Sequence, residues 1–169
     1  MNKSKCLLFV LGLASFIGCG TNRFEAEVKT EEAAIKLATE TTKGGYQLVS
    51  TKDLKQWLDA DDKFLLIDAM PAKDSFAKGH IRTAINFTFP KEVMDGWKDD
   101  VMDGQSQEDF RKILGDETDR KIVVYCGFVK CARSHNAAIC AQELGFTNVY
   151  RYPGGLYAWR GAGNSVTTE

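Results

Sequence analysis

Two cysteines and two fixed positive charges share one short stretch of the sequence, "IVVYCGFVKCARSHNAA", at residues 122–138. Cys126 ends an apolar run, and Cys131 lies in the polar loop that follows it. Lys130 and Arg133 lie on either side of the second cysteine. The reactive form of cysteine is the thiolate, and nearby positive charge lowers the pKa of a thiol. The spacing therefore predicts nucleophilic cysteine chemistry on an anionic substrate, with Cys126 as the nucleophile.

The segments on either side of this loop predict where it lies. The run "KIVVYC" (121–126) is typical of a buried strand, and "RSHNAAICAQELG" (133–145) has the spacing of a helix that ends at a glycine. Cys126 would then sit at the carboxyl end of a strand, beneath the first turn of a helix. Unpaired N–H groups and the helix dipole favour an anion there. We therefore expect Cys126 to be exposed and to have a low pKa.

The rest of the chain alternates between similar strands and helices. Further buried-type strands are predicted at "FLLIDA" (64–69), "AINFTFP" (84–90) and "NVYRYP" (148–153), and further helices at "TKDLKQWLDA" (51–60) and "SQEDFRKILG" (106–115). Such alternation predicts an α/β fold with a parallel sheet and a site at the carboxyl ends of the strands. In the later helix, Cys140 lies on the apolar stripe that should face the sheet, so we assign it to the core.

Several ordered motifs resemble those of single-domain rhodanese-like proteins. They are "LLIDAMPAKDSFAKGHIRTAINF", "IVVYC", "RSHNAA" and "LGFTNVYRYPGGLYAW", and they extend from about residue 46 to residue 161. The resemblance implies a sheet of about five parallel strands flanked by helices on both faces, in a domain at 46–163 followed by a tail at 164–169. It also implies that a cysteine accepts a sulfane sulfur as a persulfide and passes it on. Cys126 stands where that cysteine stands.

The resemblance and the loop together define the predicted site. We expect Cys126, Arg133 and Cys131 to be catalytic. The substrate-binding residues should be the rest of the loop and the first residues of the helix: Gly127, Phe128, Val129, Lys130, Ala132 and Ser134. Asp68 and His80 resemble family residues that support the site through structural hydrogen bonds. His135 is expected to face solvent, Gly154 and Gly155 to form a tight turn, and Trp159 to pack in the core.

The loop departs from the family pattern in two ways. It is two residues longer than the usual rhodanese loop, counted to Ser134, and it contains a second thiol, Cys131. Cys131 has three interpretations: it resolves a persulfide on Cys126, it relays sulfur, or it packs as a small residue. The loop offers too few ligands for zinc, so neither a metal nor another cofactor is predicted. Loop length sets which anion fits over the sulfur, and it leaves the substrate open.

The amino terminus predicts export. Lys3 and Lys5 precede an apolar stretch that ends in "FIGCG", which resembles the cleavage and lipidation signal of bacterial lipoproteins. Residues 1–18 would be the signal peptide. Residues 19–45 would contain the lipidated Cys19, a tether and one short helix from Glu31 to Gly44. An uncleaved anchor and an ordinary secretory signal are the alternatives, and each of the three exports the domain.

Charge and cysteine content narrow the possible functions. The chain has a formal net charge of −1, and loss of a leader with two lysines makes it more acidic. This balance argues against nucleic-acid binding and against a polybasic membrane patch. Of the five cysteines, three would remain outside the leader and the lipid site. An odd number is unsuited to a purely structural disulfide framework.

The sequence thus predicts an exported sulfurtransferase held on the periplasmic side of the bacterial envelope by its lipid. It would move sulfur from an anionic donor such as thiosulfate or polysulfide, through a Cys126 persulfide, to a thiol or cyanide-like acceptor. One alternative is a dithiol redox or persulfide-reducing protein that uses Cys126 and Cys131. Another is a non-catalytic binding module of the envelope, and phosphatase chemistry is a more distant one. The sequence identifies neither a protein partner nor an oligomeric state.

Overall fold

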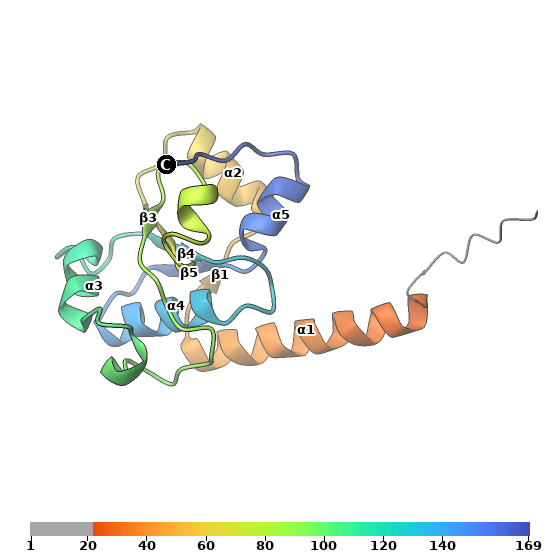
Figure 1. Cartoon of the computed structure of the whole chain (residues 1–169), viewed down its shortest axis with the longest axis horizontal. Helices are drawn as coiled ribbons and strands as arrows, with labels where there is room; N and C mark the ends of the chain where they lie inside the picture. Colours follow the sequence, from red (N-terminus) through yellow and green to blue (C-terminus); the bar gives the residue numbers. More distant parts are fainter. Residues whose placement is uncertain (1–21) are drawn as a thin grey trace, which may run out of the picture.

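A single parallel sheet organises the chain in the computed structural model, which describes residues 22–169 (Figure 1). The predicted leader at 1–18 and the lipidation site Cys19 lie outside the described residues. The strand order is β1-β5-β4-β2-β3, and every pairing is parallel. The strands are β1 (Gln47–Leu48), β2 (Leu65–Asp68), β3 (Ile85–Asn86), β4 (Ile122–Tyr125) and β5 (Val149–Tyr152). The predicted five-stranded α/β architecture is confirmed.

Helices cover both faces of the sheet, because side chains of a strand point alternately to opposite faces. Leu65 and Ile67 of β2 pack in the core that includes α3 and α4, whereas Leu66 packs in the core that includes α2 and α5. Figure 1 shows these two helix layers above and below the sheet. The helices are α1 (Arg23–Gly44), α2 (Thr51–Asp59), α3 (Gln107–Leu114), α4 (Arg133–Glu143) and α5 (Gly155–Gly161), with 3₁₀ turns at Phe76–Lys78 and Asp99–Val101.

The central strands end at the same level, and this alignment positions the site. Asp68 of β2 is the register partner of Tyr125 in β4, and Tyr125 is the partner of Tyr152 in β5. Cys126 follows Tyr125 directly, so it lies at the carboxyl edge of the sheet, as the sequence predicted. Cys140 of α4 is fully buried, and burial raises the pKa of its thiol to about 12, which agrees with a core role.

The first helix is much longer than the sequence predicted. It extends from Arg23 to Gly44, whereas the expected helix began at Glu31. The Asn22 side chain caps its start by accepting a hydrogen bond from a backbone N–H, and Gly45 ends it with a left-handed φ of 67°. The carboxyl half of α1 packs against α4, and the other half projects away from the domain (Figure 1). Within residues 22–169, no helix combines the length and apolarity needed to cross a membrane.

Candidate active site

The loop at 126–132, between β4 and α4, is called the active loop, and its start is held by the first turn of α5. The backbone N–H of Leu156 donates to the carbonyl of Cys126 at 2.9 Å, and that of Tyr157 donates to the carbonyl of Gly127 at 2.9 Å. Gly155 makes this approach possible. It has φ 58°, and a Cβ at this position would lie 2.2 Å from the Cys126 carbonyl oxygen. The predicted tight turn at this glycine is therefore confirmed, with its cause.

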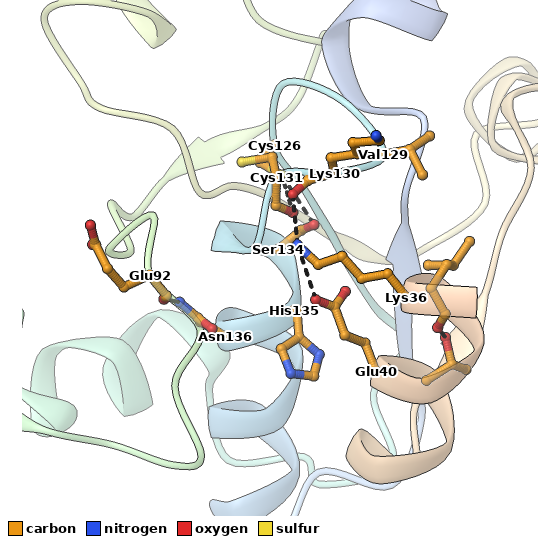
Figure 2. Close-up of polar contacts among 12 residues, drawn as sticks. Lys36, Glu40, Glu92, Cys126, Val129, Lys130, Cys131, Ser134, His135 and Asn136 are labelled. Carbon is orange, nitrogen blue, oxygen red and sulfur yellow. Dashed lines mark hydrogen bonds and ion pairs between the residues drawn. The ribbon is translucent and has the colours of Figure 1, made fainter. Parts of the chain in front are cut away.

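The loop then folds back on itself and brings its two sulfurs together. The backbone N–H of Cys131 donates to the carbonyl of Phe128 at 3.0 Å, which closes a turn before α4 begins at Arg133. This turn returns Cys131 to the end of β4, where Cys126 Sγ lies 3.5 Å from the Cys131 carbonyl oxygen and the two thiols influence each other's pKa. Both cysteines are free thiols. Figure 2 shows them grouped with Ser134 at the amino end of α4.

The expectation of an exposed, acidic thiol at Cys126 is wrong. Its side chain is 0% exposed, and Sγ lies 3.1 Å from Ser134 Oγ and 3.5 Å from the Cys131 carbonyl oxygen. Burial raises the pKa of Cys126 well above its ordinary value, because the charged form loses its hydration. Its hydrogen bond to Cys131 acts in the same direction. Burial thus favours the protonated form of Cys126.

Cys131 is the member that the site stabilises as a thiolate. Its pKa is lowered first by the hydrogen bond from the Cys126 thiol and then by the backbone N–H groups of Arg133 and Gly127. The charge of Arg133 contributes further, and partial burial opposes the shift. Cys131 is also half-buried rather than sealed. The donors at the start of α4 are thus divided: the backbone N–H of Arg133 lowers the pKa of Cys131, whereas Ser134 opposes the raised pKa of Cys126.

The two cations of the loop lie in different environments. Arg133 is half-buried, donates to the carbonyl of Phe89, and lines a cavity of about 540 Å³ between the ends of β2 and β3 and the 3₁₀ turn at Asp99–Val101. Lys130 is exposed, and its ammonium lies 3.9 Å from Glu32 of α1. The structure therefore brings Arg133 to Cys131 and directs Lys130 toward the first helix.

The remaining predicted loop residues divide by burial. Ala132 and Ser134 are buried, and the Ser134 hydroxyl contacts the Cys126 sulfur. Phe128 and Val129 are exposed at the outer surface of the loop, and the Phe128 ring packs on Tyr157 of α5 with 5.5 Å between centroids. These two apolar side chains thus lie at the surface of the loop and outside the core.

The predicted supporting residues behave as structural groups. Asp68 is fully buried and accepts a hydrogen bond from the backbone N–H of Met70 at 2.9 Å. His80 stacks on Phe76 with 3.9 Å between ring centroids and lies 3.1 Å from the Phe76 carbonyl. Trp159 is buried, as expected.

One further expectation is wrong, and two important residues were missed. His135 is buried instead of solvent-facing, with Nδ1 2.8 Å from the Tyr46 hydroxyl, and burial lowers its pKa to about 4. Sequence reasoning also overlooked Arg151 in β5 and Glu40 in α1, which form a buried ion pair at 2.6 Å. A charged residue inside the apolar run "NVYRYP" was the available signal.

The described residues contain other features that do not join the site. A larger cavity of about 810 Å³ is lined by Asp61, Lys63, Asp116 and Lys121 among others, near the amino ends of β2 and β4, and thus at the opposite edge of the sheet from the cysteines. Across residues 22–169, no group of three or more His, Cys, Asp and Glu side chains is placed to hold a metal ion.

Comparisons with known proteins agree with the fold. Residues 50–162 match the family described as Rhodanese-like domain. No curated protein matches the sequence. The chain is similar to the polysulfide-sulfur transferase homodimer of Wolinella succinogenes, with 17% identity, a TM-score of 0.52, and coverage of 87% of this chain and 91% of that one.

Two more solved structures show the same similarity. The rhodanese-like domain of the Alr3790 protein from Anabaena sp. gives 22% identity and a TM-score of 0.50, over 72% of this chain and 79% of that one. The thiosulfate sulfurtransferase of Pseudomonas aeruginosa gives 15% identity and a TM-score of 0.54, over 80% of this chain and 23% of that one. At these identities, the similarity establishes a shared fold.

Proposed function

Because the chain belongs to the rhodanese-like domain family, we propose that it is a sulfurtransferase that moves sulfane sulfur through its two loop cysteines. The observation that carries the proposal is the pair itself. Cys126 is buried, with its sulfur 3.5 Å from the Cys131 carbonyl, and the partly exposed Cys131 lies at the start of α4, where its lowered pKa favours the thiolate. A thiolate held in this way is a nucleophile at neutral pH.

The donor would be a small anion with a terminal sulfane sulfur, such as thiosulfate or a polysulfide. The Cys131 thiolate attacks the outer sulfur of thiosulfate and forms a new S–S bond. The original S–S bond breaks, and sulfite leaves with the bonding electron pair. Cys131 then carries a persulfide, whose negative charge is stabilised by Arg133 and by the loop N–H groups. No external oxidant or reductant is needed.

An acceptor completes the cycle. A thiolate or cyanide attacks the outer sulfur of the persulfide, and the electron pair of the breaking S–S bond returns to Cys131. The sulfur rests on the protein between the two half-reactions, so the kinetics should be ping-pong. The entry point differs from the sequence prediction, which placed the persulfide on Cys126. Supporting the change are the greater exposure of Cys131 and the burial that keeps Cys126 protonated.

Mass spectrometry tests this assignment. The reduced protein is treated with thiosulfate or polysulfide, the persulfide is trapped by alkylation, and trypsin then cleaves after Lys130, which separates Cys126 from Cys131. We expect one added sulfur on the Cys131 peptide, lost in Cys131→Ser and retained in the core control Cys140→Ala. Sulfur on the Cys126 peptide, persisting in Cys131→Ser, would restore Cys126 as the acceptor. Absence of sulfur from both peptides would refute the proposal and favour a binding module.

A second candidate function follows from the contact between the two thiols. Cys126 could attack the inner sulfur of a Cys131 persulfide, forming a disulfide and releasing hydrosulfide, which takes the proton of the Cys126 thiol. An external dithiol would then reduce the disulfide and become oxidised itself. This persulfide reductase is distinguished by Cys126→Ser. For a persulfide reductase, the wild type should release sulfide and form the Cys126–Cys131 disulfide, and the variant should accumulate the persulfide and do neither. For a pure sulfurtransferase, the wild type should form no such disulfide.

We also propose that the protein is exported and anchored in the bacterial envelope by a lipid on Cys19. The lysines, the apolar stretch and "FIGCG" of the amino terminus support this localisation. Labelling of cells with a fatty-acid analogue should tag the wild type and the control Cys6→Ala but not Cys19→Ala. Equal labelling of Cys19→Ala would contradict lipidation at that residue, and the anchor or secretory alternatives would replace it.

A further inference from the structure

Arg151 reaches the active loop from beneath. It lies in the middle of β5, its side chain is 0% exposed, and it points to the face of the sheet that α4 covers. Its Nε donates to Ser134 Oγ at 3.0 Å, and Ser134 in turn contacts the Cys126 sulfur. Its Nη2 donates to the carbonyls of Cys131 at 3.0 Å and Val129 at 3.5 Å. One guanidinium therefore contacts the loop at two carbonyls and the first turn of α4 at a third point.

The other side of the same guanidinium is bound by α1 and the start of the domain. Nη1 donates to Glu40 Oε2 at 2.6 Å and to the Tyr46 hydroxyl at 3.1 Å. All five N–H donors of Arg151 thus have a partner within the fold. A buried guanidinium without a counterion would be strongly destabilising, and Glu40 supplies that charge. Glu40 lies outside residues 50–162, the part that matches the family.

The same helix contacts the outside of the loop. Lys36 Nζ donates to the carbonyl of Lys130 at 3.0 Å and lies 3.5 Å from Glu40, while Glu32 approaches the Lys130 ammonium. Figure 2 shows Lys36 and Glu40 extending from α1 toward the loop and the start of α4. The loop is therefore held between Arg151 below and one face of α1 at its side.

These contacts dictate which way the loop peptides point. In a trans peptide, the C=O and the following N–H point in opposite directions. Because Arg151 draws the carbonyls of Val129 and Cys131 toward itself, the N–H groups of Lys130 and Ala132 turn away from it. A run of N–H groups on one side of a loop is the arrangement that binds anions.

We propose that Arg151 and Glu40 are positioning residues of the active site, and that α1 is a component of this site rather than a tether alone. The pair fixes the conformation of the loop that carries Cys131 and turns the N–H groups of Lys130 and Ala132 to the side away from Arg151. This inference rests on the proposed function, because the anion to be held is a thiolate, a persulfide or a sulfur donor. It adds two residues that contact no substrate and act through the loop.

The charged and titratable groups around Cys131 come from several elements. Arg133 lies in α4, Asp68 at the end of β2, Cys126 at the end of β4, and the Arg151–Glu40 pair joins β5 to α1. Since the pair is neutral overall, its removal changes the net charge near Cys131 little. A change in the reactivity of Cys131 would then report the loss of loop geometry.

Two variants in the full chain test the proposal without leaving a buried charge unpaired. Glu40→Gln/Arg151→Met removes both charges, which a buried pair tolerates better than loss of one partner. Arg151→Lys keeps the charge beside Glu40 but lacks the planar fork that bridges the loop carbonyls. The matched control is Lys43→Met, also in α1, which breaks the exposed ion pair between Lys43 and Asp95, a residue between β3 and α3.

The readout is the rate of Cys131 alkylation as a function of pH, with folding checked by circular dichroism. We expect both variants to fold, with the apparent pKa of Cys131 raised toward the ordinary thiol value of about 8.5, and alkylation at pH 7 slower by about tenfold or more. Lys43→Met should match the wild type. A wild-type pH profile in either folded variant would overturn the proposal, and so would unfolding of both, since the pair would then be a requirement of the fold only.

Alkylation requires no sulfur donor, so this experiment is independent of the sulfurtransferase proposal. If thiosulfate and polysulfide leave the wild type without added sulfur, the proposed function fails while the pH profiles still decide the role of Arg151 and Glu40. Where sulfur transfer is observed, KM for the donor should rise more than kcat falls in Arg151→Lys, because the variant loses anion binding more than chemistry.

Discussion

Replacement of Asp68 by asparagine should stabilise the protein at neutral pH. The carboxylate is fully buried at the end of β2, where Oδ1 accepts the Met70 N–H and Oδ2 has no hydrogen-bond partner. Burial is the main cause that raises the pKa of Asp68 to about 6, and the nearby Tyr125 hydroxyl opposes only part of this shift. Asparagine has nearly the same shape, keeps the acceptor for Met70, and carries no charge to bury.

The size and sign of the effect follow from the linkage of protonation to folding. An aspartate in the unfolded chain titrates near pH 4, and each unit of pKa difference corresponds to about 1.4 kcal/mol. The raised pKa of about 6 therefore means that ionised Asp68 costs the native state about 3 kcal/mol. Between pH 4 and 6 the folded protein retains a proton that the unfolded chain has lost, so wild-type stability falls as the pH rises. The Asp68→Asn substitution removes this loss of stability between pH 4 and 6.

Urea unfolding at a series of pH values measures the effect. The free energy of unfolding of Asp68→Asn, minus that of the wild type, should be near zero at pH 4 and rise to about 3 kcal/mol at pH 7. The exposed control Asp62→Asn should show no such rise. Other titrating groups cancel in the difference. A flat difference for Asp68→Asn, or a loss of stability at pH 7, would refute the argument that this carboxylate is an uncompensated buried charge.

Three other predictions follow from the site. At pH 7, iodoacetamide should modify Cys131 at least about tenfold faster than Cys126, because Cys131 is partly exposed with a lowered pKa and Cys126 is buried with a raised pKa. Peptide mapping after timed quenching measures both rates, and equal rates would contradict this difference between the two thiols. Gly155→Ala should cost more than about 3 kcal/mol in thermal unfolding, since its Cβ meets the Cys126 carbonyl. The control Gly163→Ala has φ 76° in open space and should cost about 1–2 kcal/mol, and equal losses would show that the contact is unimportant. Burial lowers the pKa of His135 to about 4, so the unfolded chain takes up the proton first as the pH falls. The free energy of unfolding of the wild type should therefore fall by about 3 kcal/mol between pH 6.5 and pH 4. Urea unfolding of His135→Gln should show a smaller loss of stability over this range, and the same pH dependence as the wild type would refute the prediction.

The positions of the central strands and of three helices could be predicted from the sequence. The central strands are buried on both faces, so their sequences are continuous apolar runs. Strands β2, β4 and β5 and helices α2, α3 and α4 all lie within the predicted segments. The edge strands β1 and β3 have only two residues each, and their extent depends on pairing with neighbours that local pattern does not reveal.

The predicted start of α1 was wrong for a local reason. Thr30 has the type of a capping residue, but its hydroxyl donates to the carbonyl of Ala26 inside a continuing helix. The upstream residues "RFEAEVK" include several good helix formers, and Asn22 provides the actual cap.

The sequence predicted a cysteine at the strand end but was wrong about its exposure and its pKa. Position at a strand end follows from sequence, whereas exposure depends on what covers that end. Here α5 closes over the start of the loop, and the turn from Phe128 to Cys131 covers the rest. Arg151 was missed for a related reason, since a buried arginine is plausible only with its counterion. That counterion, Glu40, lies 111 residues away in the sequence.

The fold-back of the longer loop also bears on which thiol takes up sulfur. The N–H groups of Gly127 and Arg133 lower the pKa of Cys131. A donor anion that approached Cys126 would have to displace the Cys131 thiolate from these groups and then reach a sulfur that is sealed from solvent. Attack by Cys131 needs neither step, because its side chain is only partly buried. The added residues of the loop therefore favour a mechanism in which the second cysteine meets the substrate and the first, at the strand end, supports it with a proton.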